Sequence, residues 1–417
     1  MIRLSCSKAD ITPDRPVSLA GYAGRTGPSS GVESRLEANI AVFEDASGRK
    51  AAIVAIDCLF AGHELENRIL GRAAEHGLKQ QDVLVFASHT HYAPQFDDDL
   101  KRLGAFDSAA FENASATILA ALDRAITGPV ADITIRTSSG PIEGAIHRRR
   151  RSTWPRLSRH GLKLGGVLFA PNPEGQIDHA GSVVVLESRQ GTPLAILWRW
   201  TCHPTNQPDP SALSADFPGV VREHLRKTFS ADLPCLFLQG FAGDVRADTS
   251  DHRPSLGHWC RNMVFGPSFP ANTPQSYRAW TAKIATGVAA LAATASQRRN
   301  EGEIASAITS VAGSQVLPRT PGLPAIAFRR LRLGSIADIV AVAAEPVSGL
   351  QDLIGLAGAW ACGYLGGVFG YWPTETQIGE GGYESHDMLA YFDLTGPFAK
   401  DSDTLFASAV RELRSLS

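Results

Sequence analysis

The segment Val83-Leu84-Val85-Phe86-Ala87 runs directly into Ser88-His89-Thr90-His91. The first five residues are all apolar and predict a short buried strand. The next four are polar, and two of them are imidazoles, which can bind a metal or carry a proton. Because ligands of α/β sheets bind at the carboxyl ends of strands, this stretch predicts both a sheet and a site at its edge.

The same pattern of an apolar run followed by reactive residues recurs further along the chain. The other three instances are Leu194–Trp200 before Thr201-Cys202-His203-Pro204, Cys235–Leu238 before Gln239-Gly240-Phe241-Ala242-Gly243-Asp244, and Ile339–Ala344 before Glu345-Pro346. Strand ends that are distant in sequence can meet in one crevice, so we expect these clusters to converge.

Amphipathic, helix-like runs alternate with these strands, which predicts a mixed α/β (α+β) fold of layered β-sheets flanked by helices. The predicted helices are Glu64–His76, Ser108–Ile126, Gly219–Phe229, Gln275–Ser296 and Asp403–Leu416. The Pro- and Gly-bearing stretches Arg253–Pro274 and Leu317–Pro324 predict surface loops or a domain boundary. No internal repeat is present.

Composition excludes several classes of protein. The 417 residues carry 40 Lys+Arg and 42 Asp+Glu, a net charge of −2, which argues against a partner such as nucleic acid or an anionic membrane surface. The most apolar window, Ile336 to Cys362, contains Asp338, Glu345 and Asp352, so no stable membrane insertion is expected. Without a signal-peptide pattern at the start, a cytoplasmic location is predicted. The six cysteines form no Cys-x-x-Cys pair and are predicted to be buried thiols.

His89 and His91 are two residues apart, so their side chains would share one face if the strand continued through Ser88. A metal site and a pair of ordinary histidines both fit this spacing. His203 ends another apolar run and precedes Pro204, which suits a presented imidazole, although a core or capping histidine is the alternative. The neighbouring Cys202 raises a rival chemistry, a thiolate nucleophile with a histidine base.

Glu345 follows so apolar a run that its carboxylate would be costly to bury unless it is paired or ligates a metal. Two histidines and one carboxylate form a common catalytic zinc set that leaves a position for water. The alternative is that Glu345 caps a following helix. Asp216 and Asp244 lie in turn sequences, where short carboxylates bond to backbone amides, and we expect structural or supporting roles for both.

The run Arg148-Arg149-Arg150-Arg151 predicts a solvated charged face, unless one member binds an oxyanion or a substrate anion. The Gly-rich stretch from Tyr371 to Glu384, which includes Tyr383, predicts a loop. Tyrosines on such a loop are more often packing residues than catalytic ones.

Taken in order, these motifs make the chain resemble the catalytic domain of the neutral ceramidase family, which consists of zinc-dependent amidases. The resemblance runs almost end to end. It rests on Ala9-Asp10-Ile11-Thr12-Pro13, Gly21-Tyr22, Ser88-His89-Thr90-His91, Cys202-His203-Pro204-Thr205, Ser214-Ala215-Asp216, Gly243-Asp244-Val245, Glu345 and Tyr371 to Glu384. The chain resembles the shorter bacterial homologues more closely, by His147-Arg148-Arg149 and Asn172-Pro173-Glu174-Gly175.

The resemblance implies a role for each of these residues. It implies that one Zn²⁺ is held by His89, His203, Glu345 and Tyr371, with His91 beside the metal for proton transfer; which of His89 and His91 is the ligand is left open. It also implies that Arg148 and Tyr383 polarise the amide carbonyl and stabilise the oxyanion.

The chain departs from the family's pattern at several points. Gln239-Gly240-Phe241-Ala242 replaces a Ser-Asn element and leaves no serine nucleophile there, which favours attack by a zinc-bound water. His147 stands where Asn is expected, and Tyr92-Ala93-Pro94 where Ser-Gly-Pro is expected. The family's carboxyl-terminal immunoglobulin-like domain has no counterpart, so residues 1–417 are expected to form one domain.

The sequence thus predicts a zinc-dependent hydrolase that cleaves a linear amide bond in a small-molecule substrate. A zinc esterase, lactonase or cyclic-amide hydrolase is the first alternative. A non-catalytic metal-binding protein is the second, because Tyr371 would be a fourth protein ligand and structural zinc sites are closed. A cysteine hydrolase that uses Cys202 is the third. Substrate identity and oligomeric state are not predicted.

Overall fold

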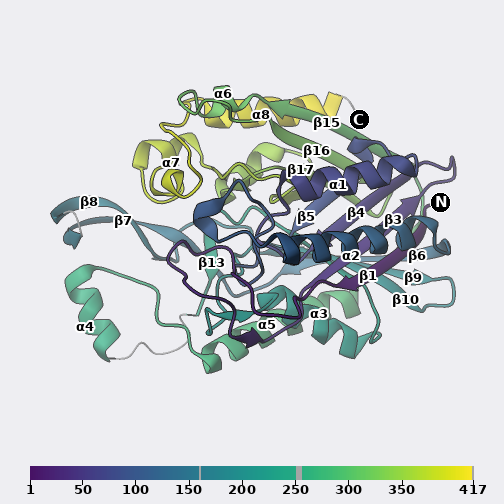
Figure 1. The fold of residues 1–417 in the computed structure, drawn as a ribbon, viewed down its shortest axis with the longest axis horizontal. Helices are drawn as coiled ribbons and strands as arrows, with labels where there is room; N and C mark the ends of the chain where they lie inside the picture. The colour runs from purple at the N-terminus through teal and green to yellow at the C-terminus, as the bar shows by residue number, and fades with distance from the viewer. Residues whose placement is uncertain (159–160, 250–255, 416–417) are drawn as a thin grey trace.

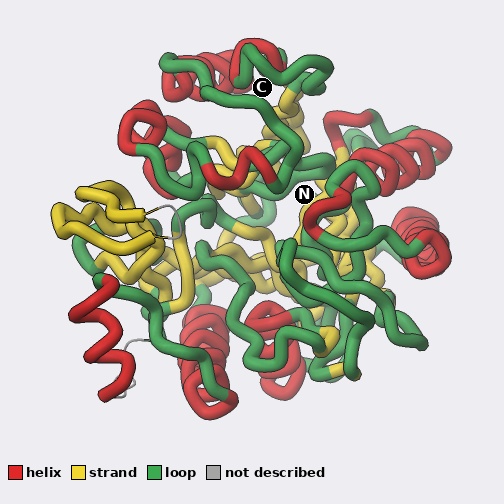
Figure 2. Tube along the Cα trace, turned by 60° about the vertical axis from the view of Figure 1, so that its left-hand side comes forward, coloured by secondary structure: helices red, strands yellow, loops and turns green. Residues whose placement is uncertain are grey.

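The computed structural model describes residues 1–158, 161–249 and 256–415, and it shows a mixed α/β architecture with several sheets. The predicted fold class is confirmed. Strands occupy the interior and most helices lie outside them, as Figure 2 shows.

The largest sheet has nine strands in the order β12-β10-β9-β6-β1-β3-β4-β5, with β14 also paired to β6. Its members are β1 (Arg3–Asp10), β3 (Glu37–Glu44), β4 (Lys50–Ile56), β5 (Val83–Ala87), β6 (Ala131–Pro141), β9 (Ala180–Ser188), β10 (Pro193–Trp200), β12 (Cys235–Gln239) and β14 (Ser296–Arg298). The pairs β4–β5 and β10–β12 are parallel and the others are antiparallel. The strands predicted to end in reactive residues are therefore present.

A second sheet packs face to face on the first. It consists of β15 (Ile304–Val311), β16 (Ile326–Leu333), β17 (Ala337–Val342) and β19 (Trp360–Cys362). One core cluster lies between the two sheets and joins Phe43, Ile53 and Leu84 of the first to Leu331 and Ile339 of the second. Alternate residues of β3, β4 and β5 pack instead on helices, so these strands are buried on both faces, which explains their continuous apolar sequences.

Helices complete four layers. α1 (Gly62–Glu75) and α2 (Ser108–Thr127) cover one half of the large sheet, α3 (Asp216–Thr228) and α5 (Pro274–Thr294) cover the other half, and α8 (Ser402–Ser415) covers the small sheet (Figure 1). All five predicted helices are confirmed. Leu416, the last residue of the fifth prediction, lies outside the described residues.

The remaining elements surround the strand ends, and several of them project from the body as a group at one end (Figure 1). They are β2 (Gly31–Val32) with β11 (Ala212–Leu213), β7 (Ala145–Ser158) with β8 (Gly161–Asn172) and β13 (Val245–Ala247), β18 (Glu345–Pro346) with β20 (Tyr371–Trp372), and the helices α4 (Leu256–Phe265), α6 (Gly313–Val316) and α7 (Glu375–Glu380). The described residues also form short 3-10 helices at Gln80–Asp82, Lys101–Leu103, Ser348–Ile354 and Asp387–Ala390.

Two loop predictions are wrong in part. α4 occupies Leu256–Phe265 within the predicted loop Arg253–Pro274, whose first three residues lie outside the described residues. The stretch Tyr371 to Glu384 contains β20 and α7, because the Thr374 side chain accepts the Gln377 N–H and caps the helix. The loop predicted at Leu317–Pro324 is confirmed.

The large sheet is curled so that its two edge strands, β5 and β12, lie against each other. The segment after β19 joins them: the Gly363 N–H donates to the Gln239 carbonyl of β12 (3.1 Å), and the Ala87 N–H of β5 donates to the Tyr364 carbonyl (3.1 Å). This curvature brings the strand-end clusters of β5, β10, β12 and β17 to one place. Among the described residues, no helix is both long and apolar enough to cross a membrane.

Candidate metal centre

Three histidines from two strand ends lie side by side, and each is held through the same ring nitrogen. The Nδ1 atoms lie within hydrogen-bonding distance of backbone carbonyls: His89 to Leu59 (3.1 Å), His91 to Gly21 (3.1 Å) and His203 to Ala242 (2.6 Å). A carbonyl accepts, so each Nδ1 carries a proton, and in the neutral ring the Nε2 then keeps its lone pair. These three histidines form a group whose ligand atoms all lie within 4.8 Å of one another.

Glu345 completes the cluster. Its Oε2 atom lies 3.2 Å from the Nε2 of His89 and 3.2 Å from the Nε2 of His203. The Nε2 of His91 lies 3.3 Å from that of His89, and the Tyr371 hydroxyl lies 3.3 Å from the Nε2 of His203. All five side chains that the sequence assigned to the metal or to the position beside it therefore lie together.

The two histidines after β5 are brought together by a backbone conformation that the sequence did not predict. The strand ends at Ala87, and His89 has φ of 67°, so the expected extended continuation through Ser88 is wrong. The resulting turn brings both imidazoles to the cluster. Gly21 allows the close approach of His91, because a Cβ at that residue would lie 2.4 Å from the His91 Nδ1.

Glu345 is placed by a short parallel pairing between β18 and β20, in which it is the direct partner of Tyr371. Its N–H donates to the Gly370 carbonyl (2.8 Å). The following 3-10 helix begins at Ser348 without a side-chain cap, so the alternative that Glu345 caps a helix is wrong. The carboxylate instead faces the imidazoles with a side-chain exposure of 2%.

Electrostatics inside the cluster favour an anionic Glu345 carboxylate and neutral imidazoles at His91 and His203. Burial raises the pKa of Glu345, but the neighbouring His89 and His203 outweigh it and hold that pKa well below its usual range. Burial, together with the charge of Arg148, lowers the pKa of His203 to about 3. Burial also lowers the pKa of His91, with His89 and His203 adding to the effect. Neutral imidazoles with free lone pairs are what a metal requires.

Arg148 and Tyr383 lie beside Tyr371 at the edge of the cluster. The Arg148 Nη2 donates to the Tyr371 hydroxyl (3.1 Å), and its Nε donates to Glu384 (2.9 Å). The Tyr383 and Tyr371 ring centroids are 5.6 Å apart, and the Arg148 guanidinium lies 5.6 Å from the Tyr383 centroid. The structure thus brings together both residues that the sequence assigned to the oxyanion.

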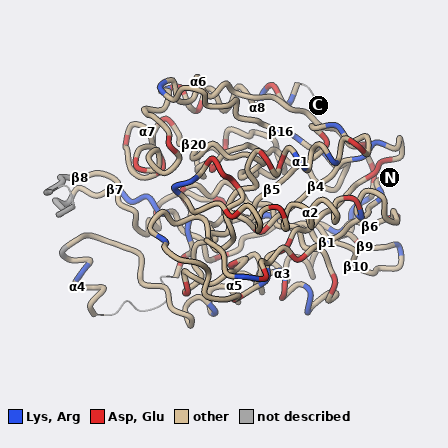
Figure 3. Tube along the Cα trace, viewed as in Figure 1, with Lys and Arg blue, Asp and Glu red and all other residues tan. Residues whose placement is uncertain are grey.

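The arginine run is not a uniform solvated face, so that prediction is wrong for half of it. Arg148 and Arg149 are buried, whereas Arg150 and Arg151 are exposed. The alternation of side chains along β7 does not explain which arginines are buried, because Arg148 and Arg149 are neighbours. The carboxylate of Glu384 explains it, since it pairs with both buried guanidinium groups. Figure 3 shows basic residues on β7 and acidic residues on α7 at the same end of the molecule.

Asp244 and Asp216 make the backbone contacts that their turns predicted. Asp244 accepts the Ser348 N–H (2.7 Å) and lies 3.1 Å from the His147 Nε2, and Asp216 accepts the Asn206 N–H (2.8 Å). Burial raises the Asp244 pKa, but the hydrogen bond and charge of His147 dominate and lower that pKa to about 2.

Cys202 does not suit a thiolate nucleophile. It is buried within an apolar cluster, and this burial raises the pKa of its thiol well above the usual range, whereas reactive cysteines have a lowered pKa. The other five cysteines are also free thiols, and four of the six are buried. Cys260 on α4 is exposed, contrary to the prediction of buried thiols.

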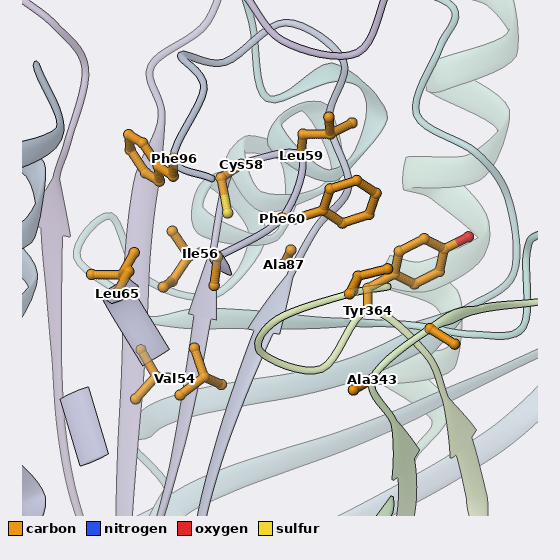
Figure 4. Close-up of a cluster of buried hydrophobic side chains, with 14 of the residues drawn as sticks. Val54, Ile56, Cys58, Leu59, Phe60, Leu65, Ala87, Phe96, Ala343 and Tyr364 are labelled. Carbon is orange, nitrogen blue, oxygen red and sulfur yellow. The ribbon is translucent and has the colours of Figure 1, made fainter. Parts of the chain in front are cut away.

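Tyr364 is a component of the site that the sequence did not reveal. Its ring lies 4.4 Å from the His89 ring, and its buried hydroxyl has no hydrogen-bond partner among the described residues. Figure 4 shows this hydroxyl turned away from the apolar cluster around Val54 and Phe60. The residue lies between two glycine-bearing turns, and only the pairing of its segment with β5 and β12 brings it to the histidines.

The similarity of this chain to known proteins lies in its fold. The chain superposes on the crystal structure of neutral ceramidase from Pseudomonas aeruginosa with a TM-score of 0.75 and 17% sequence identity, covering 99% of this chain and 74% of that one. A structure described as ceramidase complexed with C2 gives a TM-score of 0.73 at 17% identity, covering 99% and 75%. This chain has a neutral-ceramidase-like fold. No protein-family model and no curated protein sequence matches it.

Proposed function

We propose that this protein is a zinc-dependent hydrolase that cleaves amide bonds in small-molecule substrates. The proposal rests on the observation that the ligand atoms of the cluster are spaced as metal ligands. Four ligands that bind zinc tetrahedrally at 2.0–2.1 Å would lie about 3.3 Å from one another. The contacts within the cluster are 3.2 or 3.3 Å long, and they link, in order, His91, His89, Glu345, His203 and Tyr371.

Imidazole nitrogens with one carboxylate are ligands that suit zinc. We assign His89, His203, Glu345 and Tyr371 as the ligands. The Arg148 N–H that donates to the Tyr371 oxygen would stabilise that oxygen as a phenolate, the form in which tyrosine binds a metal. His91, which is half-buried and 3.3 Å from His89, lies on the solvent side of this set.

Zinc in such a site polarises a carbonyl and makes water nucleophilic near neutral pH. The protein's own groups would do the rest. His91 Nε2, held by its Nδ1 contact to Gly21, would accept a proton from the attacking water and deliver it to the leaving amine. Arg148 and Tyr383 would bind the developing oxyanion, a contact whose loss costs on the order of 10²–10³ in turnover. The likeness in fold to two ceramidase structures supports an amide as the bond cleaved.

The experiment compares matched amide and ester substrates, N-hexanoylethanolamine and 2-hydroxyethyl hexanoate. We expect hydrolysis of the amide, its loss on chelation and its recovery with Zn²⁺. His91→Gln should lower turnover while zinc stays bound, and Arg150→Gln, on the exposed part of β7, is the control. Cleavage of the ester alone would assign the protein to the esterases instead.

A non-catalytic metal site is the second candidate, and the contact of Tyr371 with His203 favours it, because a fourth protein ligand can close a zinc site. Zinc retention without hydrolysis of either substrate would support this alternative. We further propose that residues 1–417 act as one catalytic domain.

A further inference from the structure

Arg246 is an unusual cation beside the metal centre. It lies on β13, directly after Asp244 and Val245, and its guanidinium stacks on two aromatic rings, 5.0 Å from the Phe269 centroid and 5.6 Å from the Phe169 centroid. Within the described ranges no carboxylate pairs with it. The buried arginines Arg148, Arg149, Arg222, Arg226 and Arg329 each have such a partner.

Arg246 borders the reaction centre on two sides. On one side, the Phe169 ring contacts the Arg148 guanidinium at 5.0 Å and the Tyr383 ring at 6.3 Å. On the other side, burial raises the pKa of the Tyr22 hydroxyl and the charge of Arg246 opposes that rise. The Tyr22 ring lies 4.9 Å from the His91 ring. Arg246 is therefore one aromatic ring away from the proposed oxyanion groups, and its charge acts on the tyrosine that lies beside the proposed proton carrier.

The surroundings of Arg246 disfavour its charge. Burial lowers the pKa of Arg246, and the like charge of Arg148 adds to the effect. A cation removed from water in this way is costly unless an anion compensates it. The aromatic faces of Phe169 and Phe269 provide only part of that compensation.

Most other arginines near the centre have carboxylate partners: Glu384 pairs with both Arg148 and Arg149, and Glu380 pairs with Arg151. Arg25 has no carboxylate partner either, but its Nη1 donates to the Ala20 and His91 carbonyls and its other nitrogens are buried away from solvent. The half-buried Arg246 retains its donors, and a guanidinium presents them in a fork that matches the oxygens of a carboxylate or phosphate.

We propose that Arg246 binds an anionic oxygen group, carboxylate or phosphate, carried by the substrate, so that the preferred substrates are anionic amides such as N-acyl amino acids. The proposal rests on the proposed function, because it names the substrate class of the same site. Arg246 would act as a specificity residue and Phe169 and Tyr383 would line the path between the anion and the scissile carbonyl.

The test uses three amides with the same acyl chain: N-hexanoylglycine, N-hexanoyl-phosphoethanolamine and the neutral N-hexanoylethanolamine. We expect wild-type kcat/KM to be higher for at least one anionic amide than for the neutral one. Arg246→Gln should reduce that anionic-to-neutral ratio by about 10–100-fold, the usual effect of losing a hydrogen-bonded ion pair. The size of the loss for each anion distinguishes carboxylate from phosphate. Arg150→Gln should leave the ratio unchanged.

A binding measurement separates this proposal from the proposed function. Calorimetry with hexanesulfonylglycine, an analogue that contains no cleavable amide, should give a Kd about 10–100-fold higher for Arg246→Gln than for the wild type. Arg246→Lys should fall between them, because it keeps the charge but not the fork. If no amide is hydrolysed, the proposed function fails while this measurement still decides the anion site. Equal Kd values for the wild type and Arg246→Gln, or an unchanged anionic-to-neutral ratio, would overturn the proposal.

Discussion

Replacement of Glu384 by glutamine tests whether one buried carboxylate holds the arginine side of the site. Glu384 has a side-chain exposure of 1%, and it accepts hydrogen bonds from Arg148 Nε (2.9 Å) and Arg149 Nη1 (2.6 Å), whose side chains are 4% exposed. The glutamine side chain would keep the shape of the glutamate but would leave buried Arg148 without a counter-charge and Arg149 with only Glu380. Removing one partner of a buried ion pair costs about 3–5 kcal/mol, so we expect a loss of that size in the free energy of unfolding.

The assay is urea denaturation followed by fluorescence, with Glu380→Gln as the matched control. Glu380 also pairs with Arg149 and Arg151, but Arg151 is 75% exposed and Arg149 would keep Glu384 as its partner. The control should therefore lose no more than about 1 kcal/mol. We expect Glu384→Gln also to lower amide turnover, since Arg148 would lose one of its two anchors. A loss of stability equal to that of the control would refute the reasoning.

Three further predictions concern the supports of the histidines and the rival nucleophile. Gly21→Ala should displace His91, because the added Cβ would lie 2.4 Å from its Nδ1 at a φ of 103°; we expect destabilisation by more than about 1 kcal/mol in urea titrations and reduced turnover. Burial lowers the pKa of His147, but the hydrogen bond and charge of Asp244 outweigh burial and raise that pKa above its usual value. The stability that this ion pair provides is therefore complete below about pH 6.5 and is lost as the pH rises through the folded-state pKa. The difference in unfolding free energy between the wild type and His147→Asn should therefore shrink as the pH rises above about 6.5, and a growing difference would contradict this sign. Cys202→Ala should keep its turnover, and complete inactivation without loss of metal would restore the thiolate hypothesis.

The sequence was enough to predict the strands that are buried on both faces. β5, β10 and β12 are buried on both faces, so their sequences are apolar except for Arg199 in β10 and Gln239 at the end of β12. The polar residues that follow mark where each strand ends. The sequence analysis did not predict α4, because the prolines and glycines on either side of it dominate the stretch Arg253–Pro274. Its ten residues contain one glycine and no proline.

From the residue pattern alone, the candidate site was predictable only where a reactive residue follows a strand, whereas Tyr371, Arg148 and Tyr383 were indicated by the family resemblance. His89, His203 and Glu345 do so, and all three lie in the cluster. Glu384 and Tyr364 act through pairings with residues far away in the sequence, namely Arg148 and Ala87, which no local pattern encodes. The left-handed φ of His89 is likewise set by its tertiary surroundings.

The likeness to neutral ceramidases, first indicated by short ordered motifs, is confirmed for the fold. At 17% identity the same motifs leave the metal, the bond cleaved and the substrate as proposals. Arg246 directly follows the motif Gly243-Asp244-Val245 in the sequence. The two aromatic rings that surround its guanidinium are visible only in the structure.

The metal content of the purified protein, measured by elemental mass spectrometry after loading with Zn²⁺ and gel filtration, tests the central claim most directly. The structure predicts about one zinc per chain in the wild type and in Cys202→Ala, and its loss in Glu345→Ala, whose carboxylate contacts both His89 and His203. A wild-type chain that retains no zinc, or a Glu345→Ala variant that binds it as fully as the wild type, would contradict the assignment of this cluster as a metal centre.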